Sequence, residues 1–306
     1  MTDTAPMTDE MRDLLHAEAV SITADLVSID STNTGDPASI GDGETRVCRR
    51  IAEYLDEVGI PSRLVESVPG RGSLFARVDG ADPGAGGLVV HGHVDVVPAV
   101  AEDWTVPPFS GEIHDGWLYG RGTVDMKNMI GMMLAVVRHH RREGIVPRRP
   151  LLLAFFADEE AAGTMGAKWV VREHPEIFDG MTHALSEVGG WSVPVAGRRL
   201  YPIAVAEKGV AWARVSANGA AAHASRPTTD NAVAAIAGAV HRVASRHFPV
   251  APTEANAALA AAVGEIAGSS GDVADLPAHL GVLGHFGPLV EASLSHTASP
   301  TILSAG

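Results

Sequence analysis

The 306-residue chain is long enough for two domains of ordinary size or for one large domain. Hydrophobic residues make up 46% of the chain and charged residues 20%, which is typical of a soluble globular protein with a sizeable core. The net charge of −14 argues against a nucleic-acid partner, because phosphate binding requires clustered lysines and arginines. No run of about 18 apolar residues is present, so the sequence predicts no membrane span.

The N-terminal sequence and the cysteine content predict a cytoplasmic protein. Acidic residues occur where a signal peptide carries positive charge, and no apolar core follows them. The single cysteine, Cys48, has no partner for an internal disulfide, which fits a reducing compartment.

Between Asp9 and Arg198 the apolar residues follow helical and extended patterns in turn. Strands that alternate with helices predict an α/β layered domain with a mixed, mainly parallel sheet, which we expect to comprise residues 1–199. In chain order, the predicted elements are helices from Asp9 and from Gly43 to a stop at Gly59, strands at 63–65, 74–78 and 88–90, a helix carrying Met126 to Val137, a strand at 151–156, a helix near 166–172 and a strand near 184–186.

The pattern changes after Arg198, and residues 200–306 are expected to form a second domain. Apolar residues alternate in part over 203–215, and the following GAAAHASRP predicts a loop. The alanine-rich run 231–243 predicts a helix, and 251–270 is compatible with a helix followed by a loop.

Polar residues suited to binding a ligand follow directly after predicted strands. Ligands of α/β sheets gather at the carboxyl ends of the strands, so we expect these side chains to lie on one rim. They are His93, Asp158, Glu159, Glu160 and Glu187.

An imidazole beside several carboxylates is the donor set of a two-metal hydrolase. Ions such as Zn²⁺ take imidazole nitrogen and carboxylate oxygen, and a pair of ions needs a carboxylate that bridges them. His93 is a candidate ligand, and Asp95 lies two residues on, on the same strand face, where it can orient the imidazole. Asp125, at the start of a predicted helix, is the candidate bridge.

Glu159 and Glu160 are adjacent, so one can bind a metal while the other takes a proton from water. Glu187 supplies a further carboxylate. Each feature alone has a simpler interpretation: a His-X-His pair is more often structural, a Glu-Glu pair is usually a solvated helix start, and Asp125 could cap the helix that follows it. Their joint placement after strands of one sheet favours the metal site.

Three segments carry a resemblance to a known family: HGHVDVVP, DWTVPPFSGEIHDGWLYGRGTVDMKN and the DEE run at 158–160. From about Asp9 to its last residue, the chain resembles the dinuclear zinc metallopeptidase family of aminoacylase, glutamate carboxypeptidase, acetylornithine deacetylase and succinyl-diaminopimelate desuccinylase. The resemblance implies a carboxypeptidase or deacylase that uses two zinc ions, with Co²⁺ as an alternative, on a small peptide or an N-acyl amino acid.

The resemblance also assigns the metal ligands. His93 and Glu187 would hold one ion, Glu160 would hold the other, and Asp125 would bridge both.

It further implies that Glu159 is the general base and that Asp95 orients His93. A cis peptide is expected at Asp125–Met126, as the family often has one there. His91 is interpreted as structural. The residues Met126, Met129 and Met133 are interpreted as core packing.

Residues 200–306 resemble the inserted α+β lid of this family, through which its members commonly form homodimers. The resemblance implies that His223 stabilises the tetrahedral intermediate, usually in the partner's site; the alternative is a loop histidine bonded to the main chain. Asn231 is a weaker candidate for binding the substrate carboxylate.

The sequence departs from the family pattern near its end. The family's last metal ligand is a histidine located after the lid, and His279, His285 and His296 all precede that point, so none matches it. We therefore expect an incomplete second metal site and a chain that is C-terminally incomplete. The alternative function is a non-catalytic remnant that binds metal or dimerises without turnover.

Overall fold

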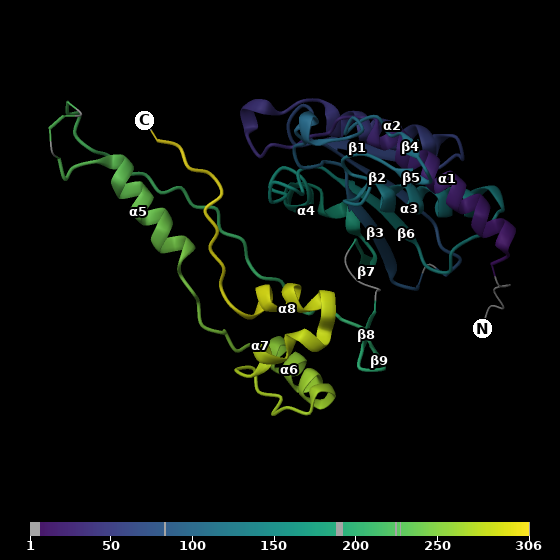
Figure 1. Cartoon of the computed structure of the whole chain (residues 1–306). Coiled ribbons are helices and arrows are strands. Elements are labelled where there is room, and N and C mark those ends of the chain that lie inside the picture. Colours follow the sequence, from purple (N-terminus) through teal and green to yellow (C-terminus); the bar gives the residue numbers. More distant parts are fainter. Residues whose placement is uncertain (1–6, 83, 188–191, 224, 227, 306) are drawn as a thin grey trace. The chain divides into compact units, whose positions relative to one another are not determined.

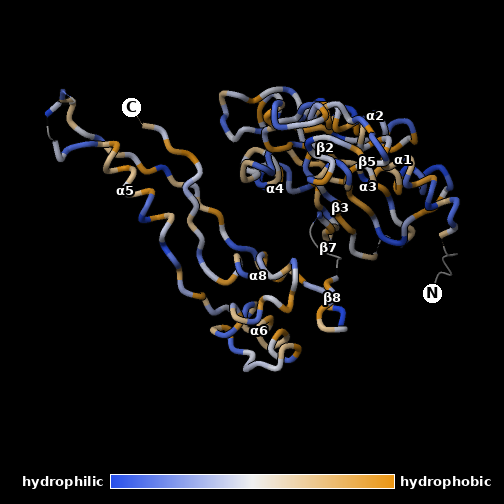
Figure 2. Tube along the Cα trace, viewed as in Figure 1, coloured by the Kyte–Doolittle hydropathy of each residue, from blue (hydrophilic) through white to orange (hydrophobic). Residues whose placement is uncertain are grey.

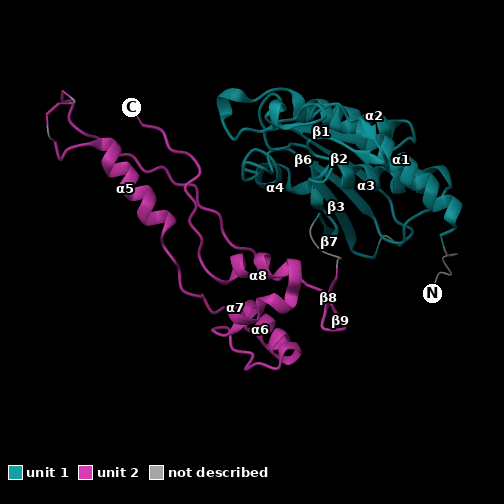
Figure 3. Cartoon of the chain, viewed as in Figure 1, with its two compact units in different colours: residues 1–188 teal, residues 189–306 magenta. Residues whose placement is uncertain are grey.

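The structure is a computed structural model that describes residues 7–82, 84–187, 192–223, 225–226 and 228–305. The chain divides into two compact units, Met1–Val188 and Gly189–Gly306, so the division precedes the boundary expected after residue 199 (Figure 3). Among the described residues, none of the helices combines the length and the apolar character needed to cross a membrane.

A five-stranded sheet with the order β1-β2-β6-β3-β7 forms the centre of the first unit (Figure 1). Strand β2 is antiparallel to both β1 and β6, whereas β6, β3 and β7 are parallel to one another. The predicted mixed sheet is therefore confirmed. The strands are β1 (Ser62–Glu66), β2 (Gly72–Val78), β3 (Gly87–His93), β6 (Leu151–Phe156) and β7 (Met181–Leu185).

Both faces of the sheet are covered, because successive side chains of a strand point to opposite faces. In β6, Leu153 and Phe155 pack in the core that holds buried residues of α1 (Asp9–Val27), α2 (Gly43–Asp56) and α3 (Lys127–Arg142). The alternate β6 residues pack against Val170 of α4 (Ala167–Glu173) in a separate core. Figure 2 shows hydrophobic stretches of the first unit in orange.

The predicted helices of this unit are present, with ends set by local signals. The side chain of Thr8 accepts a hydrogen bond from the main-chain N of Met11 at the start of α1, as an N-cap does. After α2 the chain turns at Gly59, whose φ of +68° is a left-handed conformation that glycine adopts without strain. Ile29, included in the predicted stripe, lies beyond the end of α1.

Short elements complete the first unit. They are the 3₁₀ helices η1 (Pro37–Ser39), η2 (Ala101–Asp103) and η3 (Pro175–Phe178), and the hairpin of β4 (Ile113–His114) and β5 (Trp117–Leu118).

The second unit has its own smaller core, formed by the hairpin of β8 (Val193–Val195) and β9 (Arg198–Leu200) with helices of the C-terminal part. The alternating segment 203–215 forms no strand and is exposed, whereas the helix predicted at 231–243 is present as α5. None of the described residues of α5 is buried. The helices are α5 (Ala232–Ala244), α6 (Glu254–Ala267), α7 (Leu276–His279), η4 (Leu280–Phe286) and α8 (Gly287–Leu294).

Candidate metal centre

The carboxyl ends of the three parallel strands meet at one rim of the sheet. His93 is the last residue of β3, the DEE run follows the end of β6, and Glu187 follows the end of β7. Since parallel strands end at the same edge, the order of elements alone brings an imidazole and several carboxylates together there.

Three side chains of this rim converge closely enough to share one cation. The Nε2 atom of His93 lies 2.9 Å from Oδ1 of Asp125 and 3.5 Å from Oε2 of Glu187. One donor atom from each of these residues lies within 4.8 Å of the other two. One nitrogen and two carboxylate oxygens are the ligands that Zn²⁺ takes in catalytic sites, so the donor chemistry fits a divalent ion.

Asp95 supports His93 from behind, and it also holds the neighbouring loop. The nearest acceptor for the other imidazole nitrogen, Nδ1 of His93, is the main-chain oxygen of Asp95 at 3.0 Å, and the Asp95 carboxylate lies at 3.5 Å. The two oxygens of that carboxylate accept hydrogen bonds from the main-chain N atoms of Glu159 and Glu160, each at 3.1 Å. The buried Asp95 therefore links the imidazole to the loop that carries both glutamates.

Glu159 and Glu160 occupy different positions relative to the imidazole. Oε2 of Glu159 lies 3.8 Å from Nε2 of His93, an approach that Glu160 does not make. Neither glutamate is part of the three-residue cluster. Burial, together with the nearby Glu187, raises the pKa of Glu159. Burial and the negative charge of Asp125 raise the pKa of Glu160 to about 7. The two adjacent carboxylates thus differ in their neighbours, and their separate roles as base and ligand stay predictions.

The rim has a surplus of negative charge, and His93 responds to it. Burial lowers the pKa of His93, but its hydrogen bond to Asp95 and the charges of Asp95, Glu159 and Glu187 outweigh burial and raise the pKa to about 10. Burial likewise raises the pKa of Asp95, and hydrogen bonds from His93 and Asn33 lower it below its usual value. The surplus of negative charge on these carboxylates favours the binding of a cation.

Asp125 lies two residues before the start of α3. The bond Asp125–Met126 is cis, as predicted. Helix α3 begins at Lys127 with Met126 as its N-cap, so Asp125 does not cap the helix and its carboxylate remains available to the rim. Nζ of Lys127, which is fully buried, donates to the main-chain oxygens of Leu26 and Ile29 and so ties the start of α3 to the end of α1.

The remaining predicted residues lie elsewhere or have local partners. His223 belongs to the second unit, where its Nδ1 lies 2.8 Å from Oγ of Ser225, so its catalytic role stays a prediction. The side chain of Asn231 caps α5 by accepting from Ala234 N, which gives it a structural role. His91 stacks edge-on against Phe156, consistent with the structural interpretation.

Sequence patterns missed a buried polar cluster beneath the rim, formed by Asn33, Glu44, Arg71 and Asp158, which are all under 5% exposed. These residues are far apart in sequence and lie in unrelated motifs, so no spacing rule joins them. The sequence places Asp158 directly after a predicted strand, whereas its φ of +63°, a left-handed conformation, is visible only in the structure. Burial raises the pKa of Glu44 to about 7, with the charge of Asp95 adding to the effect.

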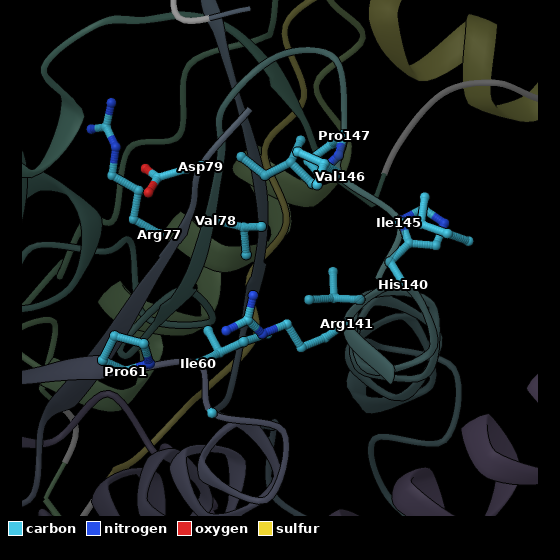
Figure 4. A pocket seen from close by; sticks show the side chains of 13 residues that line it. Ile60, Pro61, Arg77, Val78, Asp79, His140, Arg141, Ile145, Val146 and Pro147 are labelled. Atoms are coloured by element: carbon cyan, nitrogen blue, oxygen red, sulfur yellow. The ribbon is translucent and has the colours of Figure 1, made fainter. Parts of the chain in front are cut away.

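A cavity of about 290 Å³ lies at the opposite edge of the sheet, near the first residue of β6 (Figure 4). Apolar side chains such as Ile60, Val78 and Val146 line it, together with Arg141 and His140. It shares no residue with the rim, so the candidate site is defined by its donor atoms and not by this cavity.

An α/β sheet whose parallel strand ends carry one imidazole and several carboxylates is an arrangement suited to a metal-dependent hydrolase. Residues 89–288 match the model of peptidase family M20/M25/M40, and the chain belongs to this family.

Curated relatives have several activities. The chain is 32% identical over 217 residues to N-fatty-acyl-amino acid synthase/hydrolase PM20D1 of Xenopus tropicalis, covering 67% of this chain and 41% of that protein. It is 31% identical to aminoacylase-1 of Sus scrofa, covering 60% and 44%. It is 30% identical to succinyl-diaminopimelate desuccinylase of Rhodospirillum centenum, covering 74% and 57%. The chain thus spans about two fifths to three fifths of the length of these relatives.

Solved structures agree on the fold. Human carnosine dipeptidase 1 superposes with a TM-score of 0.51 at 22% identity, covering 62% of this chain and 44% of that one.

Proposed function

We propose that the protein is a metal-dependent hydrolase that cleaves the amide bond of a small peptide or an N-acyl amino acid. The observation that carries this proposal is the convergence of His93 Nε2, Asp125 Oδ1 and Glu187 Oε2 within 4.8 Å of one another. The names of the relatives support the substrate class, because they describe hydrolysis or synthesis of N-acyl amino acids and removal of acyl groups.

Zinc is the proposed ion, with Co²⁺ as an alternative, since the donors are imidazole nitrogen and carboxylate oxygen. His93 and Glu187 would hold one ion, Asp125 would bridge, and Glu160 would hold a second. When bound, the ions supply the positive charge that acidifies a water molecule and polarises the scissile carbonyl.

Glu159 is the proposed general base. Its carboxylate is about half exposed (53%) and lies beside the cluster, 3.8 Å from His93 Nε2, where it can reach a water molecule at the rim. Its raised pKa suits a group that takes a proton from water and later returns it to the leaving amine. Asp95 would keep the imidazole of His93 in one orientation through Nδ1.

The second unit is the proposed lid and dimerisation domain, with His223 acting on the reaction intermediate in the partner's site. Exposed apolar side chains of the second unit support a homodimer, because surfaces of this kind favour association. They include Ile203 (81% exposed), Val210 (79%) and Trp212 (79%). A cytoplasmic location is also proposed, supported by the free, buried Cys48.

The direct test replaces Glu159 by Gln in the 306-residue chain and measures zinc content and hydrolysis of an N-acyl amino acid and a dipeptide. We expect zinc to remain bound and turnover to be lost, whereas the exposed Glu143→Gln variant keeps both. Turnover in Glu159→Gln equal to that of the unsubstituted chain rules out the proposed base. Zinc binding without turnover in the unsubstituted chain supports the non-catalytic alternative.

A further inference from the structure

We propose that Arg71 is a positioning residue of the metal centre: its buried guanidinium anchors the polar cluster that holds Asp95 and the Glu159–Glu160 loop in place. This inference rests on the proposed metal site. It assigns a role to a side chain that reaches none of the three converging ligands itself.

Arg71, only 4% exposed, lies next to the first residue of β2 and contacts three polar side chains. One terminal nitrogen, Nη1, donates to the carboxylate of Glu44. The other, Nη2, donates to Oδ1 of Asn33 at 2.8 Å and lies 3.9 Å from Oδ1 of Asp158. The guanidinium therefore joins residues from three separate parts of the chain.

The contacts continue from this cluster to the rim. The amide nitrogen of Asn33, Nδ2, donates to Oδ2 of Asp95 at 2.8 Å and to Oδ1 of Asp158 at 3.2 Å. Glu44 Oε1 accepts from the main-chain N of Asp158 at 2.8 Å. Because the Asp95 carboxylate in turn accepts from the amides of the two glutamates, an unbroken series of hydrogen bonds runs from Arg71 to the proposed base and ligand.

Charge explains why a cation is needed at this point. Glu44, Asp95 and Asp158 are 4%, 0% and 3% exposed, and buried carboxylates are costly unless they are paired and hydrogen-bonded. The other fully buried cation nearby, Lys127, donates to main-chain oxygens. Asp95 is paired with the imidazole of His93, whereas Glu44 and Asp158 are paired with the guanidinium of Arg71. The fork geometry of the guanidinium matches two acceptors at once.

The buried cluster holds the backbone turn at Asp158, which directly precedes Glu159 and Glu160. With a φ of +63° this residue adopts a left-handed conformation that side-chain-bearing residues seldom take. Its N and Oδ1 are bonded within the cluster, and its Oδ2 accepts from Met165 N at 2.8 Å. The turn that directs Glu159 and Glu160 to the rim is therefore fixed on both sides by buried hydrogen bonds.

Arg138 provides a matched control for the loss of a buried arginine. It is 6% exposed and its guanidinium pairs with Glu18 and Glu57, linking α3 to other helical segments without contacting any rim residue. Arg71→Met and Arg138→Met therefore both remove a buried guanidinium from the same unit, and only the first removes support for the rim.

The experiment measures the zinc dissociation constant of the full 306-residue chain by competition with a chromophoric chelator, with melting temperature measured in parallel. We expect Arg71→Met to weaken zinc binding by roughly 10–100-fold, the range for loss of outer hydrogen-bond partners of a metal site. Arg138→Met is expected to lower the melting temperature and leave zinc affinity unchanged. Hydrogen exchange of the peptide containing Glu159 and Glu160 should accelerate only in the Arg71 variant.

Two further variants keep the test decisive if Arg71→Met does not fold. Asn33→Ala removes the hydrogen bond to Asp95 and leaves every charged side chain in place. We expect weaker zinc binding and faster hydrogen exchange at the main-chain amides of Glu159 and Glu160. Arg71→Lys retains the positive charge without the forked guanidinium. We expect this variant to recover part of the zinc affinity that is lost in Arg71→Met.

Equal zinc affinity in the unsubstituted chain and in Asn33→Ala or Arg71→Met overturns the role of this cluster while leaving the metal site intact. Absence of zinc binding in the unsubstituted chain overturns the proposed function, and the inference with it.

Discussion

The imidazole of His93 and the carboxylate of Asp125 face each other, with Nε2 and Oδ1 2.9 Å apart across 32 positions of sequence. His93 is fixed by β3 and by its contact with Asp95, whereas Asp125 precedes α3 at the cis peptide. The imidazole of His93 is buried (3% exposed) and the carboxylate of Asp125 is exposed (63%), so the cluster is open to solvent on the side of Asp125.

A metal ion bound by this pair should stabilise the folded chain. At a free zinc concentration of 100 times the dissociation constant, the free energy of unfolding should rise by about 2.7 kcal/mol, because the ion binds only the folded state. Urea unfolding with and without zinc measures the rise. In Asp125→Asn, which keeps the shape and removes the charge, most of this stabilisation should disappear; an equal rise in that variant contradicts the role of Asp125 as a ligand.

The core face of α3 should be far more sensitive to truncation than its outer face. Ile130 is fully buried against the sheet, and Met132 of the same helix is 48% exposed. We expect Ile130→Ala to lower the free energy of unfolding by about 2–5 kcal/mol, through lost burial and the cavity that remains. Met132→Ala should change it by less than about 0.5 kcal/mol. Chemical denaturation of the two variants side by side checks the difference, and similar losses would argue against this placement of the helix.

Stability should fall in acid through Glu18. Hydrogen bonds from Arg142 and Arg138 lower the pKa of this carboxyl below its ordinary value, against the opposing effect of burial. Since the folded-state pKa is lower than the unfolded one, the contribution is complete above the unfolded pKa and is lost as pH falls through the folded pKa. Glu18→Gln should therefore lower the free energy of unfolding by about 1–3 kcal/mol at pH 7. Between pH 6 and pH 3 the variant should lose less of its free energy of unfolding than the unsubstituted chain does. Unfolding curves of the unsubstituted chain and of Glu18→Gln at those pH values test this prediction. The same pH dependence of stability in the two proteins would contradict the pairing of Glu18 with Arg142 and Arg138.

Gly166 should tolerate no side chain. A Cβ atom at this position would lie 1.6 Å from the main-chain oxygen of Ala157, directly before the DEE loop. We expect Gly166→Ala to destabilise the chain by about 1–3 kcal/mol or more, since the obstacle is main chain and moves only with the loop. Zinc affinity should fall as well. Gly41→Ala is the control, because nothing lies within 4 Å of its Cβ position, and calorimetry of both variants gives the comparison. Equal melting temperatures would show that the loop can move aside.

Much of the first unit was predictable because its signals are local. The stripe beginning at Asp9, the continuous apolar run 151–156 and the placement of His93 and Glu187 after strands each depend on a few neighbouring residues. The segment 203–215 shows the opposite case. Its alternating apolar residues form a strand only where another strand pairs with them. In the structure no described strand pairs with this segment, and it stays without regular secondary structure.

By itself the sequence determined the order of strands and helices, and with it the rim on which acids and imidazole gather, because a parallel sheet places the ends of its strands on one edge. It could not determine which nitrogen of His93 faces Asp125, that Asp95 holds the glutamate loop through its amides, or that Arg71, Asn33 and Glu44 support that loop. These relations join residues far apart in the chain, and their strength comes from burial, where charge and hydrogen bonding act with little screening by water. Only the tertiary structure creates that burial.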